Sequence, residues 1–283
     1  MRRLNIPACD ARIAFETCIS GVRDPTLRAK LASVTADIVA AETAYKGCAV
    51  NGAFYTIVEA TTVAGRLTVE EMRKLYKGTF SRKNSLARRI YDEIKIAPRN
   101  GICPLCAQRD VSTLDHYLAQ SRHPALTITP VNLIPACFKC NKTKLDIQPS
   151  SAVEQTLHPY YDEVDDGAWL FARVMEGVPP AVVFFADPPD NWPTVKQERV
   201  RMHFKTFELA ALYSTHAAVE LVNIKLSLTR IAARGGPDDL KLHLVEQKES
   251  RKAVAINSWQ GAMYEALSES NWFCTEGYKV IPA

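Results

Sequence analysis

Two Cys-x-x-Cys pairs bracket an Asp-His dipeptide in the middle of the chain. The first pair is Cys103 and Cys106, the second is Cys137 and Cys140, and thirty residues separate them. Four thiolates at paired spacing make a closed tetrahedral zinc site. Because sulfur fills all four positions, no open coordination site remains for catalysis, and we expect the zinc to be structural. The alternative interpretation is a set of unrelated buried thiols.

Polar residues inside and just after this bracket suggest hydrolytic chemistry. Asp115 and His116 lie between the pairs, Asn132 follows in the segment Thr-Pro-Val-Asn-Leu-Ile-Pro, and Asn141 comes directly after the last cysteine. In order and spacing these residues resemble the HNH endonuclease family, most closely its zinc-stapled branch typified by endonuclease VII. The resemblance covers about residues 101–147, roughly a sixth of the chain.

The resemblance implies a role for each matching residue. His116 would be the general base that takes a proton from water, and Asp115 and Asn141 would hold a catalytic cation through oxygen atoms. Asn132 would orient His116 through its side-chain carbonyl. The family often has His where this chain has Asn141, which favours Mg²⁺ or Mn²⁺ over Zn²⁺ at this second site. The implied activity is metal-dependent hydrolysis of phosphodiester bonds in DNA.

Simpler roles stay open for two of these residues. Asn132 could bond the backbone of a loop, and Asn141 could cap a helix. Neighbours in a regular strand also point to opposite faces. Asp115 and His116 can therefore share a site only if the strand ends or bends there.

Positive charge is concentrated before and within the cysteine module. Residues 66–99 carry ten Lys or Arg and four acidic residues, whereas residues 151–283 have a net charge of −5. A local basic field suits a polyanionic substrate, although a solvated helix face would have the same composition. The candidate phosphate contacts are Arg88, Arg89, Lys142 and Lys144.

The sequence predicts an α+β protein, mainly helical, with a central zinc-bearing ββα-metal (HNH) module. We expect three regions: a helical part with basic helices at 1–100, the module at 101–147, and a mostly helical part with a few short strands at 148–283. The expected helices cover residues 25–45, 68–78, 84–96, 194–234 and 238–268. The expected strands cover 111–116, 169–175 and 181–185, and residues 124–130 read as a loop or a second module strand.

Other function classes find little support in the sequence. No apolar run approaches 18 residues, the first residues make a poor signal peptide, and a P-loop motif is absent. We therefore expect a cytoplasmic protein with reduced thiols, no membrane partner, and any ATP-driven control supplied by a regulatory ATPase or sensor. A role as an effector of bacterial anti-phage defence is one hypothesis. The alternatives are a non-catalytic zinc module that binds nucleic acid or protein, and a nuclease that acts on RNA.

Overall fold

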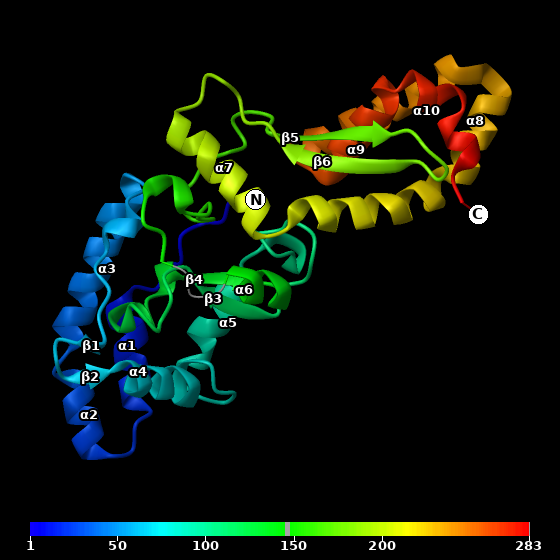
Figure 1. Cartoon of the computed structure of the whole chain (residues 1–283). Coiled ribbons are helices and arrows are strands. Elements are labelled where there is room, and N and C mark those ends of the chain that lie inside the picture. Colours follow the sequence, from blue (N-terminus) through cyan, green and yellow to red (C-terminus); the bar gives the residue numbers. More distant parts are fainter. Residues whose placement is uncertain (145–147, 283) are drawn as a thin grey trace. The chain divides into compact units, whose positions relative to one another are not determined.

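A computed structural model describes residues 1–144 and 148–282 of the chain. Its contacts divide the chain into two compact units, Met1–Asp162 and Glu163–Ala283 (Figure 1). Helices dominate, and the described residues form three two-stranded antiparallel sheets, so the predicted α+β class is confirmed. The cysteine bracket lies in the first unit. The last residues of the predicted module, 145–147, lie outside the described residues.

The first hundred residues form helices around an apolar core. These elements are α1 (Ala11–Ser20), α2 (Pro25–Ala32), α3 (Thr35–Val50), β1 (Thr62–Val63), β2 (Leu67–Thr68), α4 (Val69–Leu75), a π-helical turn (Tyr76–Phe80) and α5 (Arg88–Ile96). Phe15, Met72 and Phe80 are completely buried between them. Leu114 and Leu133, which belong to the cysteine module, join the same core. The module is therefore packed directly onto the N-terminal helices.

Side-chain caps start two helices where the sequence predicts them. Asp24 accepts a hydrogen bond from the Thr26 N–H, and Pro25 opens α2. At the start of α4, the Glu71 N–H donates to Thr68 Oγ1 at 3.2 Å and the Thr68 N–H donates to Glu71 Oε2 at 2.8 Å. This reciprocal capping box satisfies donors that the first turn of the helix leaves free.

Three helix bounds differ from the predictions. The helix expected over 25–45 is two helices, because buried Val34 leaves the helical backbone with φ −109° and ψ 7°. Asn84 adopts a left-handed φ of 62°, so α5 begins four residues later than expected. Gly78 was expected to end a helix, but it lies inside the π-helical turn.

The cysteine module folds as strand, strand, helix. β3 (Thr113–His116) pairs antiparallel with β4 (Leu133–Ala136), and α6 (Phe138–Lys144) follows. α5 packs against both strands and α6 packs against β3 (Figure 1). Residues 124–130 form no strand and belong to the loop between β3 and β4. The second strand of the module begins further along the chain, at Leu133. Asn141 was expected at the helix start, but α6 begins three residues earlier.

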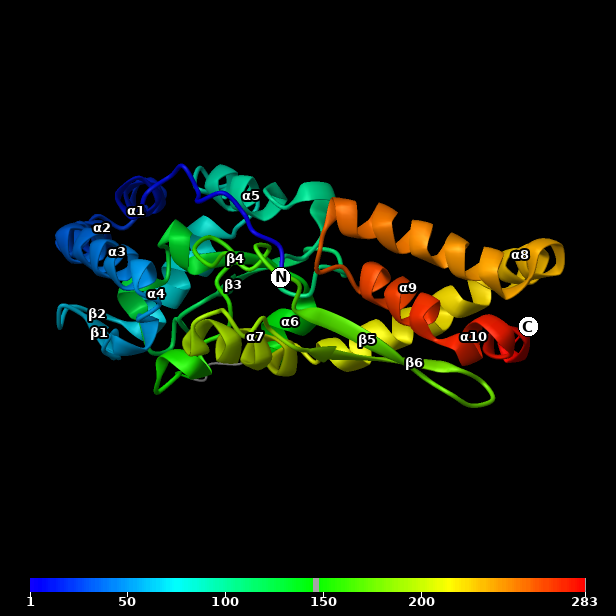
Figure 2. The same ribbon diagram turned by 90° about the horizontal axis from the view of Figure 1, so that it is seen from above.

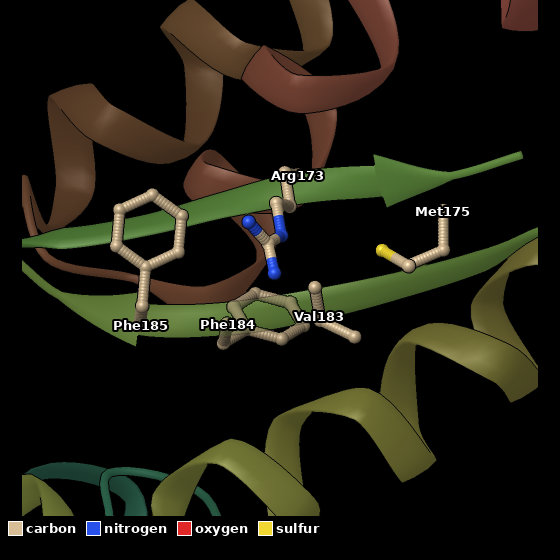
Figure 3. Close-up of a pocket in the computed structure, with 5 residues that line it drawn as sticks. All are labelled: Arg173, Met175, Val183, Phe184 and Phe185. Atoms are coloured by element: carbon tan, nitrogen blue, oxygen red, sulfur yellow. The ribbon is translucent and has the colours of Figure 1, made fainter.

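The second unit is a β-ribbon packed on helices. Its strands are β5 (Leu170–Met175) and β6 (Ala181–Ala186), as predicted, and its helices are α7 (Thr194–Thr206), α8 (Leu209–Val254), α9 (Trp259–Glu269) and α10 (Asn271–Thr275). One face of the ribbon contacts α8 and α9. The opposite face presents Arg173, Met175 and Val183 beside the stacked pair Phe171 and Phe185, part of which Figure 3 shows.

The long segment called α8 is two helical arms. Gly236 takes a φ of 73° that other residues rarely adopt, and in Figures 1 and 2 the chain turns back on itself there. This confirms the break predicted at Gly235-Gly236-Pro237. The helix expected over 194–234 is divided at Glu208, whose φ is 52°, and residues 255–258 divide the predicted last helix.

Within the described part of the chain, no helix is long and apolar enough to cross a membrane.

Candidate metal centre and adjoining polar site

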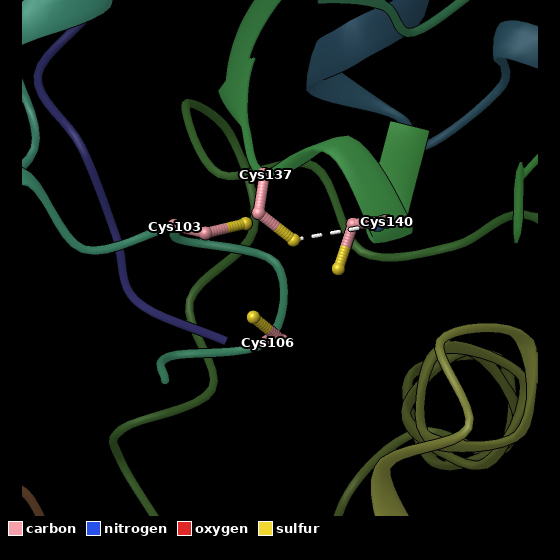
Figure 4. Close-up of side chains that lie close together, drawn as sticks. All are labelled: Cys103, Cys106, Cys137 and Cys140. Atoms are coloured by element: carbon pink, nitrogen blue, oxygen red, sulfur yellow. Dashed lines mark hydrogen bonds between the residues drawn. The ribbon is translucent and has the colours of Figure 1, made fainter. Parts of the chain in front are cut away.

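The four bracket cysteines converge on one point. All are buried, and their sulfur atoms lie within 4.8 Å of one another (Figure 4). A tetrahedral zinc–thiolate site has sulfurs about 3.8 Å apart, because each Zn–S bond is about 2.3 Å long. The cluster is therefore close to the size of a zinc site, and these four residues could hold the ion.

Two of the four sulfurs accept hydrogen bonds from backbone N–H groups, which stabilise a negative charge on sulfur. The Arg109 N–H donates to Cys106 Sγ, and the Cys140 N–H donates to Cys137 Sγ, each at 3.4 Å. Hydrogen bonds among the four thiols lower the pKa of Cys106 and Cys137 and raise that of Cys103 and Cys140, so the metal-free cluster shares its protons unevenly. Thiolates are the form that binds metal. The donor set thus fits zinc.

Cys103 is held by a short hairpin in front of the strands. An isolated β-bridge joins Ile102 to Asp110, and the Cys103 N–H donates to the Arg109 carbonyl at 2.8 Å. The second pair sits where β4 runs into α6. A cation in this cluster would therefore tie the hairpin to the strand-helix junction.

Asp115 and His116 occupy the last two positions of β3. They lie opposite Ile134 and Leu133 of β4. The strand ends at His116, which meets the condition that lets two neighbouring side chains serve one site. Both residues are largely buried, at 6% and 9% exposure.

His116 has a defined tautomer. Its Nε2 lies 2.9 Å from the Thr127 carbonyl oxygen, and a carbonyl can only accept, so Nε2 carries the hydrogen and donates. Nδ1 then keeps its lone pair. Burial is the main cause that lowers the pKa of His116 to about 4, and the charges of Lys144 and Arg73 act in the same direction. The imidazole is therefore neutral at physiological pH.

Asp115 is a buried carboxylate with one charged partner. Lys144 Nζ lies 3.3 Å from Asp115 Oδ2 and also donates to the His116 carbonyl at 2.6 Å. Burial raises the pKa of Asp115, and Lys144 opposes that rise. Asp115 Oδ2 accepts no hydrogen bond within the described residues. Lys144, a candidate phosphate contact, lies beside this carboxylate.

Asn132 does not contact His116 as the resemblance implied. Its Oδ1 accepts from the Leu118 N–H at 2.8 Å, and its Nδ2 donates to the carbonyls of Leu118 at 3.0 Å and Leu126 at 3.2 Å. The alternative, a bond to loop backbone, is what the structure contains. Asn132 therefore affects His116 indirectly. It holds the loop between β3 and β4, and that loop carries the Thr127 carbonyl that accepts a hydrogen bond from His116.

The remaining predicted residues are spread over two helices. Asn141 lies inside α6, one turn before Lys144 and so on the same face of the helix. Lys142 Nζ lies 5.8 Å from the ring of exposed Phe138. Arg88 bonds Asp92 at 2.9 Å and stacks on Tyr91, so its guanidinium already has partners.

Arg89 is a highly exposed candidate phosphate contact. Its side chain is 84% exposed, and among the described residues it has an ion pair to Glu93 at 3.3 Å on the same helix. Such exposed pairs contribute little to stability and open readily. Arg89 is therefore available to a ligand, whereas Arg88 and Lys144 are engaged.

Two residues of the site were missed in the sequence. Thr127 contributes a backbone carbonyl, which every residue has, so no pattern could mark it. Tyr76, forty residues before His116, places its ring 5.1 Å from the imidazole. A half-buried tyrosine at the end of a helix is compatible with ordinary core packing, and only tertiary structure brings it to His116.

His158 packs beside Tyr117, the residue that follows His116. Its Nδ1 accepts from the Tyr160 N–H at 3.2 Å, so Nε2 donates to Tyr45 Oη at 2.9 Å. Its ring also packs 4.3 Å from that of Tyr117, the residue after His116. His158 is completely buried and is a structural residue.

Comparison with known proteins extends over both units. Across 294 aligned residues the chain is 26% identical to protein ea31 of Escherichia phage lambda, and the alignment covers 96% of this chain and 99% of that protein. No protein-family model and no solved structure matches the chain. The likeness is thus not confined to the cysteine module.

Proposed function

We propose that this protein is a metal-dependent endonuclease of the HNH type that hydrolyses phosphodiester bonds in DNA. The observation that carries the proposal is the 2.9 Å hydrogen bond between His116 Nε2 and the Thr127 carbonyl. His116 is the last residue of β3, and the residue before it, Asp115, is a buried carboxylate. A neutral imidazole in one fixed tautomer is what a general base requires.

His116 takes a proton from water at Nδ1. The water oxygen forms a bond to phosphorus as the bond from phosphorus to the leaving oxygen breaks. The hydrogen bond to Thr127 stabilises the imidazolium that forms, because the positive ring donates more strongly to the carbonyl. Because its pKa is low, the His116 imidazole is neutral at pH 7 and has a lone pair that can accept a proton.

Asp115 and Asn141 fit the catalytic cation implied by the resemblance. Asp115 Oδ2 is buried and accepts no hydrogen bond from the described residues, its charged neighbour being Lys144 Nζ at 3.3 Å, and Asn141 lies on the same face of α6 as Lys144. Carboxylate and amide oxygens suit Mg²⁺ or Mn²⁺. When bound, such an ion supplies positive charge that stabilises the leaving oxygen. The four cysteines would hold a separate, structural Zn²⁺.

Basic residues near this site fit a phosphate backbone. Arg89 and Lys142 are on the surface, Arg89 with an exposed ion pair to Glu93, and Arg73 is close enough to lower the pKa of His116. Phosphate contacts of this kind position a nucleic acid without reading its sequence.

Plasmid nicking tests the proposal directly. Purified protein is incubated with supercoiled DNA, single-stranded DNA or RNA in Mg²⁺ or Mn²⁺. We expect nicking of DNA by the wild type and a rate at least about 100-fold lower for His116→Ala. His123→Ala is the matched control, because His123 is another buried histidine of the module, and its ring is hydrogen-bonded only to Gln148, at 2.9 Å, among the described residues.

Each result decides between the hypotheses. Equal nicking by wild type and His116→Ala would exclude His116 as the base. Binding without cleavage of any substrate would favour the non-catalytic zinc module, and cleavage confined to RNA would change the substrate. The defence role and the regulatory ATPase or sensor stay predictions from the sequence.

A further inference from the structure

The His116 ring lies against a side chain from outside the cysteine module. Tyr76 opens the π-helical turn that continues α4, and its ring centroid lies 5.1 Å from that of His116 with the planes tilted by 56°. The same ring packs 5.5 Å from completely buried Phe80. Tyr76 is thus anchored in the N-terminal core on one side and touches the imidazole on the other.

This contact restrains a motion that one hydrogen bond leaves possible. The outer torsion of a histidine side chain has a broad energy profile, so the imidazole can rotate about it at little cost. Rotation would break the bond from Nε2 to Thr127 and exchange the two nitrogens. An aromatic neighbour limits rotation because tilted ring pairs have a preferred geometry. π-Helical turns inside α-helices are also frequent at functional sites.

We propose that Tyr76 is a positioning residue for His116, holding the imidazole so that Nε2 donates to Thr127 while Nδ1 stays free to accept a proton. The inference rests on the proposed nuclease function. It makes the N-terminal helical region part of the site itself, in addition to a basic approach surface.

The aromatic ring of Tyr76, not its hydroxyl, carries this role. The hydroxyl makes no hydrogen bond to any part of the chain that the structure describes. Burial holds the pKa of Tyr76 well above its usual value, so the phenol stays neutral and is a poor proton donor. Tyr76→Phe should therefore match the wild type, and Tyr76→Ala and Tyr76→Leu should not.

The test reads the His116 tautomer by ¹⁵N NMR of labelled full-length protein without substrate. We expect one tautomer, protonated at Nε2, in the wild type and Tyr76→Phe, and a mixture in Tyr76→Ala and Tyr76→Leu. Tyr76→Leu keeps apolar volume and serves if the alanine variant fails to fold. Tyr91→Ala is the matched control, because Tyr91 packs 6.0 Å from the same Phe80 but has no ring contact with His116 among the described residues.

Kinetics adds a second readout. We expect Tyr76→Leu to lower kcat about tenfold with KM nearly unchanged, a loss confined to the transition state. A wild-type tautomer in Tyr76→Leu would overturn the inference, as would an equal disturbance in Tyr91→Ala. If the wild type cleaves no nucleic acid, the nuclease proposal fails while the spectra still decide the role of Tyr76.

Discussion

Replacing Asn132 with alanine should destabilise the first unit specifically. The buried Asn132 side chain makes three hydrogen bonds to the backbone of the loop between β3 and β4. Each such bond contributes about 1 kcal/mol net, and a buried donor left without a partner costs about 1–3 kcal/mol more. The Leu118 N–H becomes such a donor. We therefore expect a loss of about 4–6 kcal/mol in the free energy of unfolding.

Asn257 offers a matched control in the second unit. Its Oδ1 accepts from the N–H groups of Trp169 and Leu170, and its Nδ2 donates to the carbonyls of Val164 and Gly167. Asn257→Ala removes the same kind of buried backbone hub. It should cost a similar free energy without altering the loop that carries the Thr127 carbonyl.

Two probes separate the units during urea unfolding. All four tryptophans lie in the second unit, so their fluorescence reports on that unit alone. Release of zinc, followed with a colorimetric chelator, reports on the first. We expect Asn132→Ala to shift the zinc transition and lower nuclease activity, and Asn257→Ala to shift the fluorescence transition and spare activity. A shift of the zinc transition by less than about 1 kcal/mol in Asn132→Ala would refute the reasoning.

Three further outcomes follow from the site. The pKa of His116 is about 4 in the folded chain and about 6.5 in the unfolded chain, so the unfolded state binds the proton first and stability falls as the pH drops below 6.5. Between pH 7.5 and 5.5, the wild type should lose about 1 kcal/mol of unfolding free energy relative to His116→Gln in urea titrations. Parallel pH profiles of the two proteins would contradict this. Cys140→Ser should lower zinc content measured by mass spectrometry, whereas Cys274→Ser, a buried thiol elsewhere, should keep it. Lys144→Met removes the positive charge beside Asp115, so the variant should have a lower melting temperature than the wild type when no divalent metal is added. Added Mn²⁺ should raise the melting temperature of the variant more than that of the wild type. Equal rises would exclude competition between Lys144 and the ion.

Local signals in the sequence predicted local features well. The capping box at Thr68 and Glu71, the break at Gly236 and the strands of the β-ribbon depend on residues close in the chain, and all three are confirmed. Helix bounds at Val34 and Asn84 were wrong because buried packing and a left-handed turn overrode helical spacing.

The candidate site divides in the same way. The cysteine spacing alone predicted a cluster that could hold zinc, since paired ligands on two turns can converge on one ion whatever surrounds them. Asn132 was expected to bond His116, but its side-chain carbonyl accepts from the Leu118 N–H, and Lys144, a candidate phosphate contact, lies beside Asp115. Their partners are a carboxylate and loop carbonyls brought near by folding.

The sequence by itself determined which chemical groups are present and in what order: four thiols, an acid beside a histidine, and two asparagine amides. Only the tertiary structure decided the state of those groups. Burial at the end of β3 keeps His116 neutral, the Thr127 carbonyl selects its tautomer, and Tyr76 packs on its ring from the N-terminal helices. Tautomer and pKa depend on atoms that are close in space, and such neighbours come from parts of the chain far apart in sequence.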